Sequence, residues 1–243
     1  MQLLILGANS DIALALAAKF AQGRKANLYL ASRDMDRLTP RARDLELRFQ
    51  VKAEPVFFDA LDYASHSGFF EGLNPKPDGV ILAFGYLGNQ SKAQADFEEA
   101  RKIIETNFLG AVSILEVVAA DFEERGQGFI MGLSSVAGDR GRAANYVYGS
   151  AKGALKVFLS GLRNRLDRKG VKVTTVLPGQ VLTKMTRDLD LDIKRLAQPD
   201  QVAGDIYKAY LKSKDIIYTP PLWRLIMAVI KAIPERVFKR LDL

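Results

Sequence analysis

The sequence contains no cysteine among its 243 residues. Disulfides, thiolate nucleophiles and cysteine-ligated metals are therefore excluded. Its one histidine, His66, excludes a multi-histidine metal site and argues against a Ser-His-Asp triad. We expect no metal site. His66 follows the third expected strand in a short helix, and we interpret it as a surface residue.

The chain also lacks a long apolar run. No apolar segment approaches the roughly 20 residues of a membrane span, and residues 1–7 are too short for a signal peptide. We expect a cytoplasmic protein, and the content of 48% hydrophobic and 26% charged residues is typical of a globular domain. The net charge of +7 is spread through the sequence. It favours diffuse surface charge over a nucleic-acid-binding stripe, with an anionic membrane, an acidic carrier or a phosphorylated ligand as alternatives.

Short apolar strands alternate with helical segments along the chain. This order, at intervals of roughly 25–35 residues, predicts βα units and one α/β domain with a doubly wound parallel sheet and helices on both faces. We assign residues 1–221 to this domain and residues 222–243 to a C-terminal extension of it. The expected strands are residues 3–6, 27–31, 51–58, 79–83, 128–133, 171–177 and 216–219, and the expected helices include 12–21, 63–72, 92–104, 105–124, 148–169 and 199–212.

The first strand leads into Gly7-Ala8-Asn9-Ser10, after which Asp11 opens a helix. A strand, a glycine turn and a helix begin a dinucleotide-binding fold, in which the helix amides and dipole receive phosphate. Since only one glycine is present, an ordinary βα loop is the alternative.

Tyr148 and Lys152 lie four residues apart at the start of a later helix. This spacing places both side chains on one helical face. A neighbouring ammonium favours the phenolate and lowers the tyrosine pKa from its usual value of about 10. The pair is therefore a candidate proton donor to a carbonyl and acceptor from an alcohol.

Together these motifs resemble the short-chain dehydrogenase/reductase family over nearly the whole chain, which implies a Rossmann-type fold and an oxidoreductase that uses NAD(P). The resemblance rests on six motifs in family order: Gly7-Ala8-Asn9-Ser10, Asp59, Asn107, Ser134-Ser135, Tyr148-Gly149-Ser150-Ala151-Lys152, and Pro178-Gly179-Gln180-Val181-Leu182-Thr183.

The resemblance implies four catalytic residues. Tyr148 would protonate the carbonyl oxygen, and Lys152 would lower the Tyr148 pKa and bind the nicotinamide ribose. Ser135, thirteen residues before the tyrosine as in the family, would polarise the carbonyl. Asn107 would hold a water that relays protons to Lys152.

The end of the second strand bears on the choice of cofactor. It carries Ser32 and Arg33 and no acid at the strand tip, which suits a 2′-phosphate and favours NADP(H), whereas the nearby Asp34 keeps NAD(H) as the alternative. The family resemblance further implies that Asp59 would meet the adenine and that Pro178, Gly179 and Thr183 would flank the nicotinamide carboxamide. The full set of expected cofactor-binding residues is Gly7, Asn9, Ser10, Asp11, Ile12, Ser32, Arg33, Asp59, Ala60, Ala83, Gly85, Tyr148, Lys152, Pro178, Gly179, Val181 and Thr183.

The sequence departs from the family pattern at two places. Asp11 and Ala13 replace the second and third turn glycines, and a carboxylate at residue 11 puts the local phosphate geometry in doubt. Ala83-Phe84-Gly85 replaces Asn-Ala-Gly, so the structural hydrogen bond of that asparagine must be supplied otherwise.

A narrower resemblance is to the decaprenylphosphoryl-2-keto-pentose reductases, which reduce a 2-keto sugar carried on a polyprenyl phosphate. It rests chiefly on the tail, where apolar residues beginning at Leu222 and Trp223 are edged by basic ones. Such a segment can lie in a membrane interface, at the inner face of the cell membrane. The alternatives are packing on its own domain, over the substrate cleft or across a dimer.

Two other enzyme activities and one binding function remain open. A 3-oxoacyl-carrier-protein reductase or a general carbonyl reductase explains the catalytic residues equally well but leaves the tail unexplained. An NADPH-sensing binding protein normally lacks the tyrosine or lysine, and both are present. The resemblance also implies a homo-oligomer, a dimer or tetramer. We expect the polar stretch 183–198 to cover the site.

Overall fold

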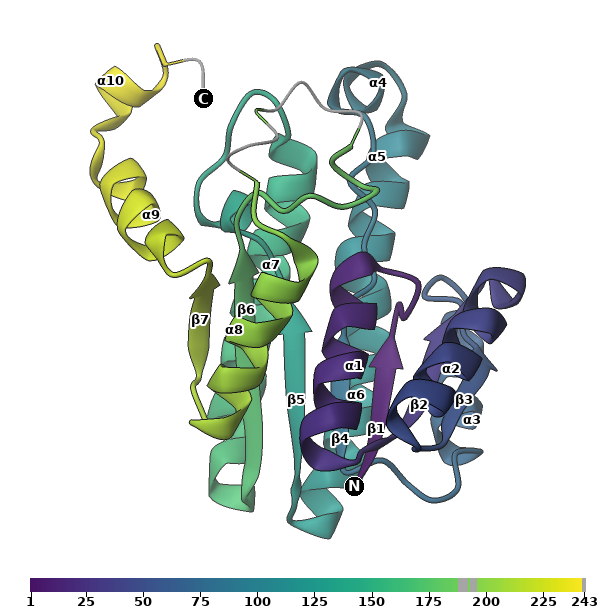
Figure 1. Ribbon diagram of the computed structural model, residues 1–243. Coiled ribbons are helices and arrows are strands. Elements are labelled where there is room, and N and C mark those ends of the chain that lie inside the picture. Colours follow the sequence, from purple (N-terminus) through teal and green to yellow (C-terminus); the bar gives the residue numbers. More distant parts are fainter. Residues whose placement is uncertain (188–191, 193–195, 242–243) are drawn as a thin grey trace.

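The computed structural model describes residues 1–187, 192 and 196–241. In these residues the chain forms a seven-stranded sheet with the order β3-β2-β1-β4-β5-β6-β7 (Figure 1). Every neighbouring pair of strands is parallel, as the sequence predicts. The strands are β1 (Gln2–Leu6), β2 (Asn27–Ser32), β3 (Ala53–Phe57), β4 (Gly79–Leu82), β5 (Gly128–Leu133), β6 (Val171–Pro178) and β7 (Ile216–Thr219).

Helices cover both faces of the sheet. Figure 1 shows α1, α2 and α8 on the near face and α5, α6 and α7 behind. The α-helices are α1 (Asp11–Arg24), α2 (Met35–Phe49), α3 (His66–Glu71), α4 (Gln90–Ala95), α5 (Phe97–Ile104), α6 (Gly110–Arg125), α7 (Tyr146–Leu166), α8 (Pro199–Leu211), α9 (Leu222–Ala232) and α10 (Glu235–Phe238). The short turns η1 (Tyr63–Ser65), η3 (Val136–Asp139) and η4 (Asp167–Lys169) and the π-helical η2 (Glu105–Leu109) join them.

The central strands β1 and β4 are buried along their whole length because helices cover both faces of the sheet, whereas the edge strands β3 and β7 are partly exposed. In β1, Leu3 and Ile5 pack in the core that α1 and α8 share, whereas Leu4 and Leu6 pack in the core of α6 and α7. All four side chains are fully buried. Alternation along the strand thus divides the interior into two cores.

The segment before α6 differs from the expected single helix over residues 92–104. Asp96 adopts an extended conformation, with φ −130° and ψ 109°, and its carboxylate accepts a hydrogen bond from the Glu98 amide at 3.0 Å. This cap ends α4 and starts α5. The following η2 is a π-helical insertion, a feature often found at functional sites, and it carries Asn107.

By length and composition alone, the continuous helical stretch Phe97–Arg125 is apolar enough to cross a membrane. This finding differs from the expectation from the sequence that no apolar segment approaches the length of a membrane span. The inner face of α6 packs against the sheet, where Ile114, Leu115 and Val118 are fully buried. Core packing therefore accounts for the apolar character of this face.

The order of the strands reverses between β1 and β4. The chain proceeds from β1 outward to β2 and β3, then returns to place β4 on the other side of β1. In such a sheet the helices leave in opposite directions at this point, and ligands bind in the crevice at the carboxyl ends of the strands. The site is built there.

Candidate active site

A cavity of about 960 Å³ occupies the crevice at the carboxyl ends of the strands. Three of the four expected catalytic residues line it, as do all the expected cofactor-binding residues. Its wall includes Gly7, Asn9, Ser10, Asp11, Ile12, Ser32, Arg33, Asp59, Ala60, Ala83, Gly85, Ser135, Tyr148, Lys152, Pro178, Gly179, Val181 and Thr183. Asn107 lies behind this wall.

The turn after β1 requires glycine at residue 7. Gly7 has a φ of +84°, and a Cβ there would lie 2.4 Å from the Phe84 backbone nitrogen. The turn can therefore pack directly against the segment after β4. The next residues open α1, whose first-turn N–H groups have no partner within the helix and provide a phosphate site at its N-terminus.

Asp11, which replaces a family glycine, forms a contact across the cavity mouth. Its Oδ2 accepts a hydrogen bond from the backbone N–H of Lys184 at 2.9 Å. Arg41 and Lys184 both interact electrostatically with the carboxylate. Its charge is thereby offset, and the residue ties the segment after β6 to the nucleotide turn.

Cationic side chains cluster around the carboxyl end of β2 and the N-terminus of α1. Arg33, Arg37 and Lys184 line the cavity, and Arg41 donates from Nη1 to the Asn9 carbonyl oxygen at 3.2 Å. Desolvation, together with the like charges of Arg37 and Arg41, lowers the pKa of Lys184. This end of the cavity is suited to a multiply charged anion.

Asn9 provides a further polar group at the same end. Its Nδ2 donates to the Ser32 hydroxyl at 2.9 Å and to the Asp34 carbonyl oxygen at 2.8 Å. Its Oδ1 is buried and has no hydrogen-bond partner in the described part of the chain. An adenosine phosphate would bring donors and acceptors to this position, so the residues present fit a dinucleotide.

His66 is not a surface residue, contrary to the sequence-based interpretation; it is fully buried. Its Nε2 lies 3.0 Å from the Asp59 carbonyl oxygen, and its Nδ1 lies 2.8 Å from the Ser113 hydroxyl. Because a carbonyl oxygen only accepts, Nε2 carries the proton and Nδ1 accepts from the serine. The imidazole thus holds the backbone of the loop after β3.

That loop places Asp59 on the cavity wall. Its Oδ1 accepts from the Leu61 amide at 3.0 Å and lies 3.7 Å from Nη1 of Arg33. The carboxylate is therefore engaged locally, at the position where the family resemblance expects an adenine contact.

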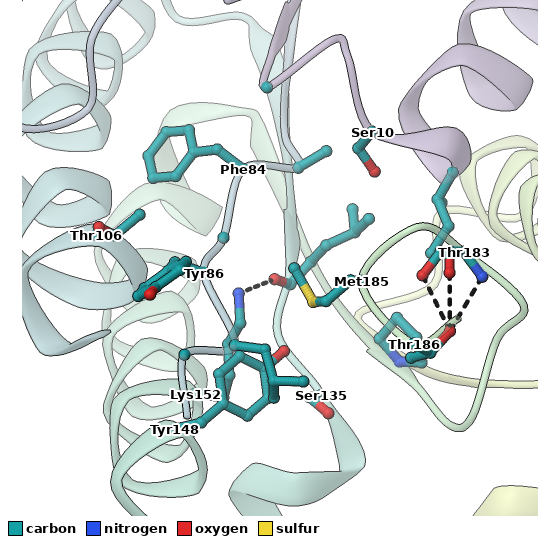
Figure 2. A pocket seen from close by; sticks show the side chains of 18 of the residues that line it. Ser10, Phe84, Tyr86, Thr106, Ser135, Tyr148, Lys152, Thr183, Met185 and Thr186 are labelled. Atoms are coloured by element: carbon teal, nitrogen blue, oxygen red, sulfur yellow. Dashed lines mark hydrogen bonds between the residues drawn. The ribbon is translucent and has the colours of Figure 1, made fainter. Parts of the chain in front are cut away.

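Ser135 and the start of α7 meet because small residues let η3 approach the helix. A Cβ at Gly149 would lie 2.8 Å from the Ala137 carbonyl oxygen, so a larger residue would push η3 away. The Ser135 hydroxyl accepts from the Ala137 amide at 3.1 Å and also hydrogen-bonds to Tyr148. Figure 2 shows Ser135, Tyr148 and Lys152 together on one side of the cavity.

The pKa of Tyr148 shifts in the direction opposite to the expected one. Burial raises it to about 12, and only the hydrogen bond from Ser135 opposes this rise. Burial also lowers the pKa of Lys152 to about 8. The Lys152 Nζ lies 5.8 Å from the centroid of the Tyr148 ring and donates to the Leu133 carbonyl oxygen at 3.1 Å (Figure 2). Removal from water therefore outweighs the attraction between the two groups.

Asn107 is fully buried and supports the loop after β4. Its Nδ2 donates to the carbonyl oxygens of Tyr86 and Ile103 at 2.6 and 2.8 Å, and its Oδ1 accepts from the Tyr86 amide at 3.2 Å. These bonds fix the strand end where the family's Asn-Ala-Gly is Ala83-Phe84-Gly85. The expected role of Asn107 as a water holder stays a prediction.

The C-terminal helix α9 packs on its own domain. Met227 is fully buried in a small cluster with Val136 and Leu177, and Arg140 donates to the Ile233 carbonyl oxygen at 2.7 Å. Trp223 reaches the cavity wall. The opposite face of α9 is exposed: Leu222, Leu225 and Val229 retain 64%, 64% and 58% of their accessible surface.

Several cavity residues escaped the sequence analysis. Gln90, Arg142 and Asn145 line the cavity near Tyr148, but no motif marks them. Part of the expected covering stretch also lines it, through Thr183, Lys184, Met185 and Thr186; residues 188–191 and 193–195 of that stretch lie outside the described residues.

The parallel sheet, the glycine turn and the Tyr148–Lys152 face define a nucleotide-dependent oxidoreductase of the Rossmann type. The sequence pattern of the family described as short chain dehydrogenase matches residues 2–194. An uncharacterized oxidoreductase of Mycobacterium tuberculosis is 35% identical over 240 residues, covering 98% of this chain and 95% of the relative. The chain therefore belongs to the short-chain dehydrogenase family and is an NAD(P)-dependent oxidoreductase.

Two further proteins are similar to this chain. An NADP-dependent 3-hydroxy acid dehydrogenase of Schizosaccharomyces pombe is 30% identical over 211 residues, covering 85% of this chain and 79% of that protein. The short-chain dehydrogenase of Sphingobium yanoikuyae, solved with NADPH, superposes with a TM-score of 0.84 at 23% identity over 96% of both chains. That structural likeness supports the fold.

Proposed function

We propose that the protein reduces a ketone with NADPH, with Tyr148 as the proton donor and Ser135 and Lys152 beside it. The main support for this proposal is that these three side chains lie together on one wall of the cavity. The other end of the same cavity has the N-terminus of α1 and a cluster of cations. Nicotinamide, when bound, supplies the hydride.

The protein's own residues then position the carbonyl and transfer the proton. The Ser135 hydroxyl orients the carbonyl oxygen toward Tyr148, whose phenol gives up its proton as alkoxide charge develops. Because burial raises the Tyr148 pKa to about 12, the phenol is protonated at neutral pH and ready for reduction. Lys152 is placed to stabilise the resulting phenolate and to bind a ribose hydroxyl. Asn107 holds the loop facing them.

The preference for NADPH is supported by Arg33, Arg37 and Lys184 near Ser32. Guanidinium groups bind phosphate through paired, charge-assisted hydrogen bonds, so a 2′-phosphate finds partners here that a ribose diol does not need. NADH remains the alternative cofactor.

For the substrate, we propose a 2-keto sugar on a polyprenyl phosphate, as the resemblance of the tail suggests. Trp223 on the cavity wall and the exposed apolar face of α9 support this proposal, because they offer a lipid chain a path from the cavity to a membrane surface. A 3-oxo acid is the second candidate, favoured by the likeness to the 3-hydroxy acid dehydrogenase.

The test of the function is NADPH oxidation with keto-sugar lipid phosphates, acetoacetate, acetoacetyl thioesters and simple ketones. The Tyr148→Phe variant serves as control. Turnover of one class in the wild type and its loss in the variant would support the proposal. Activity that survives the substitution would overturn the assigned mechanism.

The membrane contact has a separate test. Replacing Leu225 and Val229 with serine removes apolar surface from the exposed face of α9 and leaves the buried Met227 in place. Flotation with anionic vesicles should recover the wild type and lose this variant. Equal recovery would contradict contact through α9. We also expect a dimer or tetramer, which light scattering after size-exclusion chromatography would measure.

A further inference from the structure

Three unpaired polar atoms gather near Tyr148. Nε2 of Gln90, Nε of Arg142 and Oδ1 of Asn145 are buried and have no hydrogen-bond partner among the residues that the structure describes. All three residues line the cavity. Leaving a buried donor or acceptor unpaired costs about 1–3 kcal/mol, and such groups in a native structure call for an explanation. A ligand that pairs them is the simplest one.

The donor character of Gln90 is fixed by its other contact. Its Oε1 accepts from the Val147 backbone N–H at 3.0 Å. Since only an oxygen can accept from that N–H, the amide cannot be flipped without losing the bond. Nε2 is thus the atom left for a ligand, and the same bond joins α4 to the start of α7.

Arg142 and Asn145 belong to one tight turn before α7. The Asn145 amide donates to the Arg142 carbonyl oxygen at 3.1 Å, and Asn145 occupies the N-cap position without a side-chain cap bond. Nη2 of Arg142 lies 3.4 Å from Sδ of Met227. Among the described residues no carboxylate lies within ion-pair distance of this guanidinium. Asp139 interacts with it electrostatically but is itself paired with Lys156.

The chemistry of this cluster selects an oxygen-rich anion. Arg142 and Gln90 supply two N–H donors, one of them cationic, at the N-terminus of the 21-residue helix α7, where the helix dipole also favours negative charge. Asn145 Oδ1 adds an acceptor for a hydroxyl. The surrounding protein excludes water from these atoms, which strengthens a charge-assisted bond.

We propose that Gln90, Arg142 and Asn145 form a substrate subsite for an oxyanion, a carboxylate or a phosphate carried by the ketone. The proposal deepens the function proposed above and rests on it. Asn145 lies three residues before Tyr148 on the same helical turn, so the oxyanion sits close to the reacting carbonyl. The preferred substrates are anionic ketones, and the neutral ketone of the same size is discriminated against.

Binding of small probes tests this subsite directly. Acetoacetate and dimethyl phosphate carry the two oxyanions, and 4-hydroxy-2-butanone is a neutral ketone of similar size. Their affinities are measured by calorimetry or ligand-observed NMR on the full-length protein, with and without NADP⁺. If only acetoacetate binds tightly, the subsite is a carboxylate site, and if only dimethyl phosphate binds tightly, it is a phosphate site. If neither anion binds, the proposal is overturned.

The variants separate the subsite from general charge effects. Arg142→Gln should lower the affinity for the anion by at least about tenfold, as expected for the loss of a charge-assisted hydrogen bond. The affinity for the neutral ketone should change by less than about twofold. Arg168→Gln is the matched control, because Arg168 is exposed in η4 at the opposite end of the sheet. An equal loss in both variants, or no loss in Arg142→Gln, overturns the proposal.

A second variant tests the subsite even if Arg142→Gln does not fold. Gln90→Glu keeps an acceptor for the Val147 N–H, removes the Nε2 donor and adds a negative charge, so anion binding should be lost while neutral binding persists. NADPH oxidation distinguishes the two proposals. Anion binding without hydride transfer to any ketone refutes the proposed reaction and leaves the subsite. Reduction of neutral ketones without anion binding refutes the subsite alone.

Discussion

Replacing Lys152 with methionine should stabilise the ligand-free protein while removing its activity. Lys152 is 4% exposed, and its Nζ has one hydrogen-bond partner among the described residues, the Leu133 carbonyl oxygen. Its positive charge is therefore held away from water without a carboxylate. Methionine retains the unbranched chain and removes the charge.

The magnitude follows from the pKa of Lys152, which burial lowers from 10.5 to about 8. At about 1.36 kcal/mol per pKa unit, this fall corresponds to about 3 kcal/mol by which the charged form destabilises the folded state near pH 7. Loss of the hydrogen bond to Leu133 lowers the stability of the variant by about 1 kcal/mol. The variant should gain about 2 kcal/mol, or roughly 4–8 °C in Tm for a chain of this length.

The pH dependence has a definite sign. Between about pH 8 and 10.5 the unfolded chain holds a proton on Lys152 that the folded protein has released, so wild-type stability relative to the variant rises with pH. The advantage of Lys152→Met should accordingly fall below about 1 kcal/mol at pH 9.5.

Urea denaturation of the ligand-free protein at pH 7 and 9.5 measures both effects. Lys169→Met, at an exposed lysine in η4, is the control and should change stability by less than about 0.5 kcal/mol. A Lys152→Met protein that is less stable than the wild type at pH 7, or whose advantage does not shrink with pH, would refute the reasoning.

Three other outcomes are expected. Tyr148→Phe should lower kcat by about 10³-fold. Between pH 6 and 7.5, where a pKa of about 8 leaves most of Lys152 charged, wild-type alcohol oxidation should accelerate with pH while ketone reduction stays flat, because the pKa of about 12 keeps Tyr148 protonated; a pH-independent oxidation rate measured in steady state would contradict this. Arg33→Ala and Arg37→Ala should each raise the KM for NADPH by about tenfold and leave that for NADH unchanged; a parallel change for both cofactors would argue against 2′-phosphate binding. His66→Ala should reduce the free energy of unfolding by about 3 kcal/mol in chemical denaturation, since it empties a buried site and unpairs the Asp59 carbonyl oxygen; a loss below about 1 kcal/mol would show that the loop does not depend on the imidazole.

The sequence by itself determined the features that depend on near neighbours along the chain. Apolar strands of four to eight residues between helical segments predict the parallel sheet, because the pattern of burial along a strand reflects only the coverage of its faces. Tyr148 and Lys152 share a helical face at a spacing fixed by helix geometry. Family motif order supplied Ser135 and the glycine turn, and the structure brings these residues to one cavity.

Only the tertiary structure decided the features that depend on contacts between distant segments. Asp11 meets the amide of Lys184 from 173 positions away, and Gln90 meets that of Val147 from 57. The burial of His66 and the directions of the Tyr148 and Lys152 pKa shifts depend equally on which segments pack around them. Desolvation depends on all the segments that form the cavity wall, so a local pattern could identify Tyr148 and Lys152 as a candidate catalytic pair but could not give the energy of their charged forms.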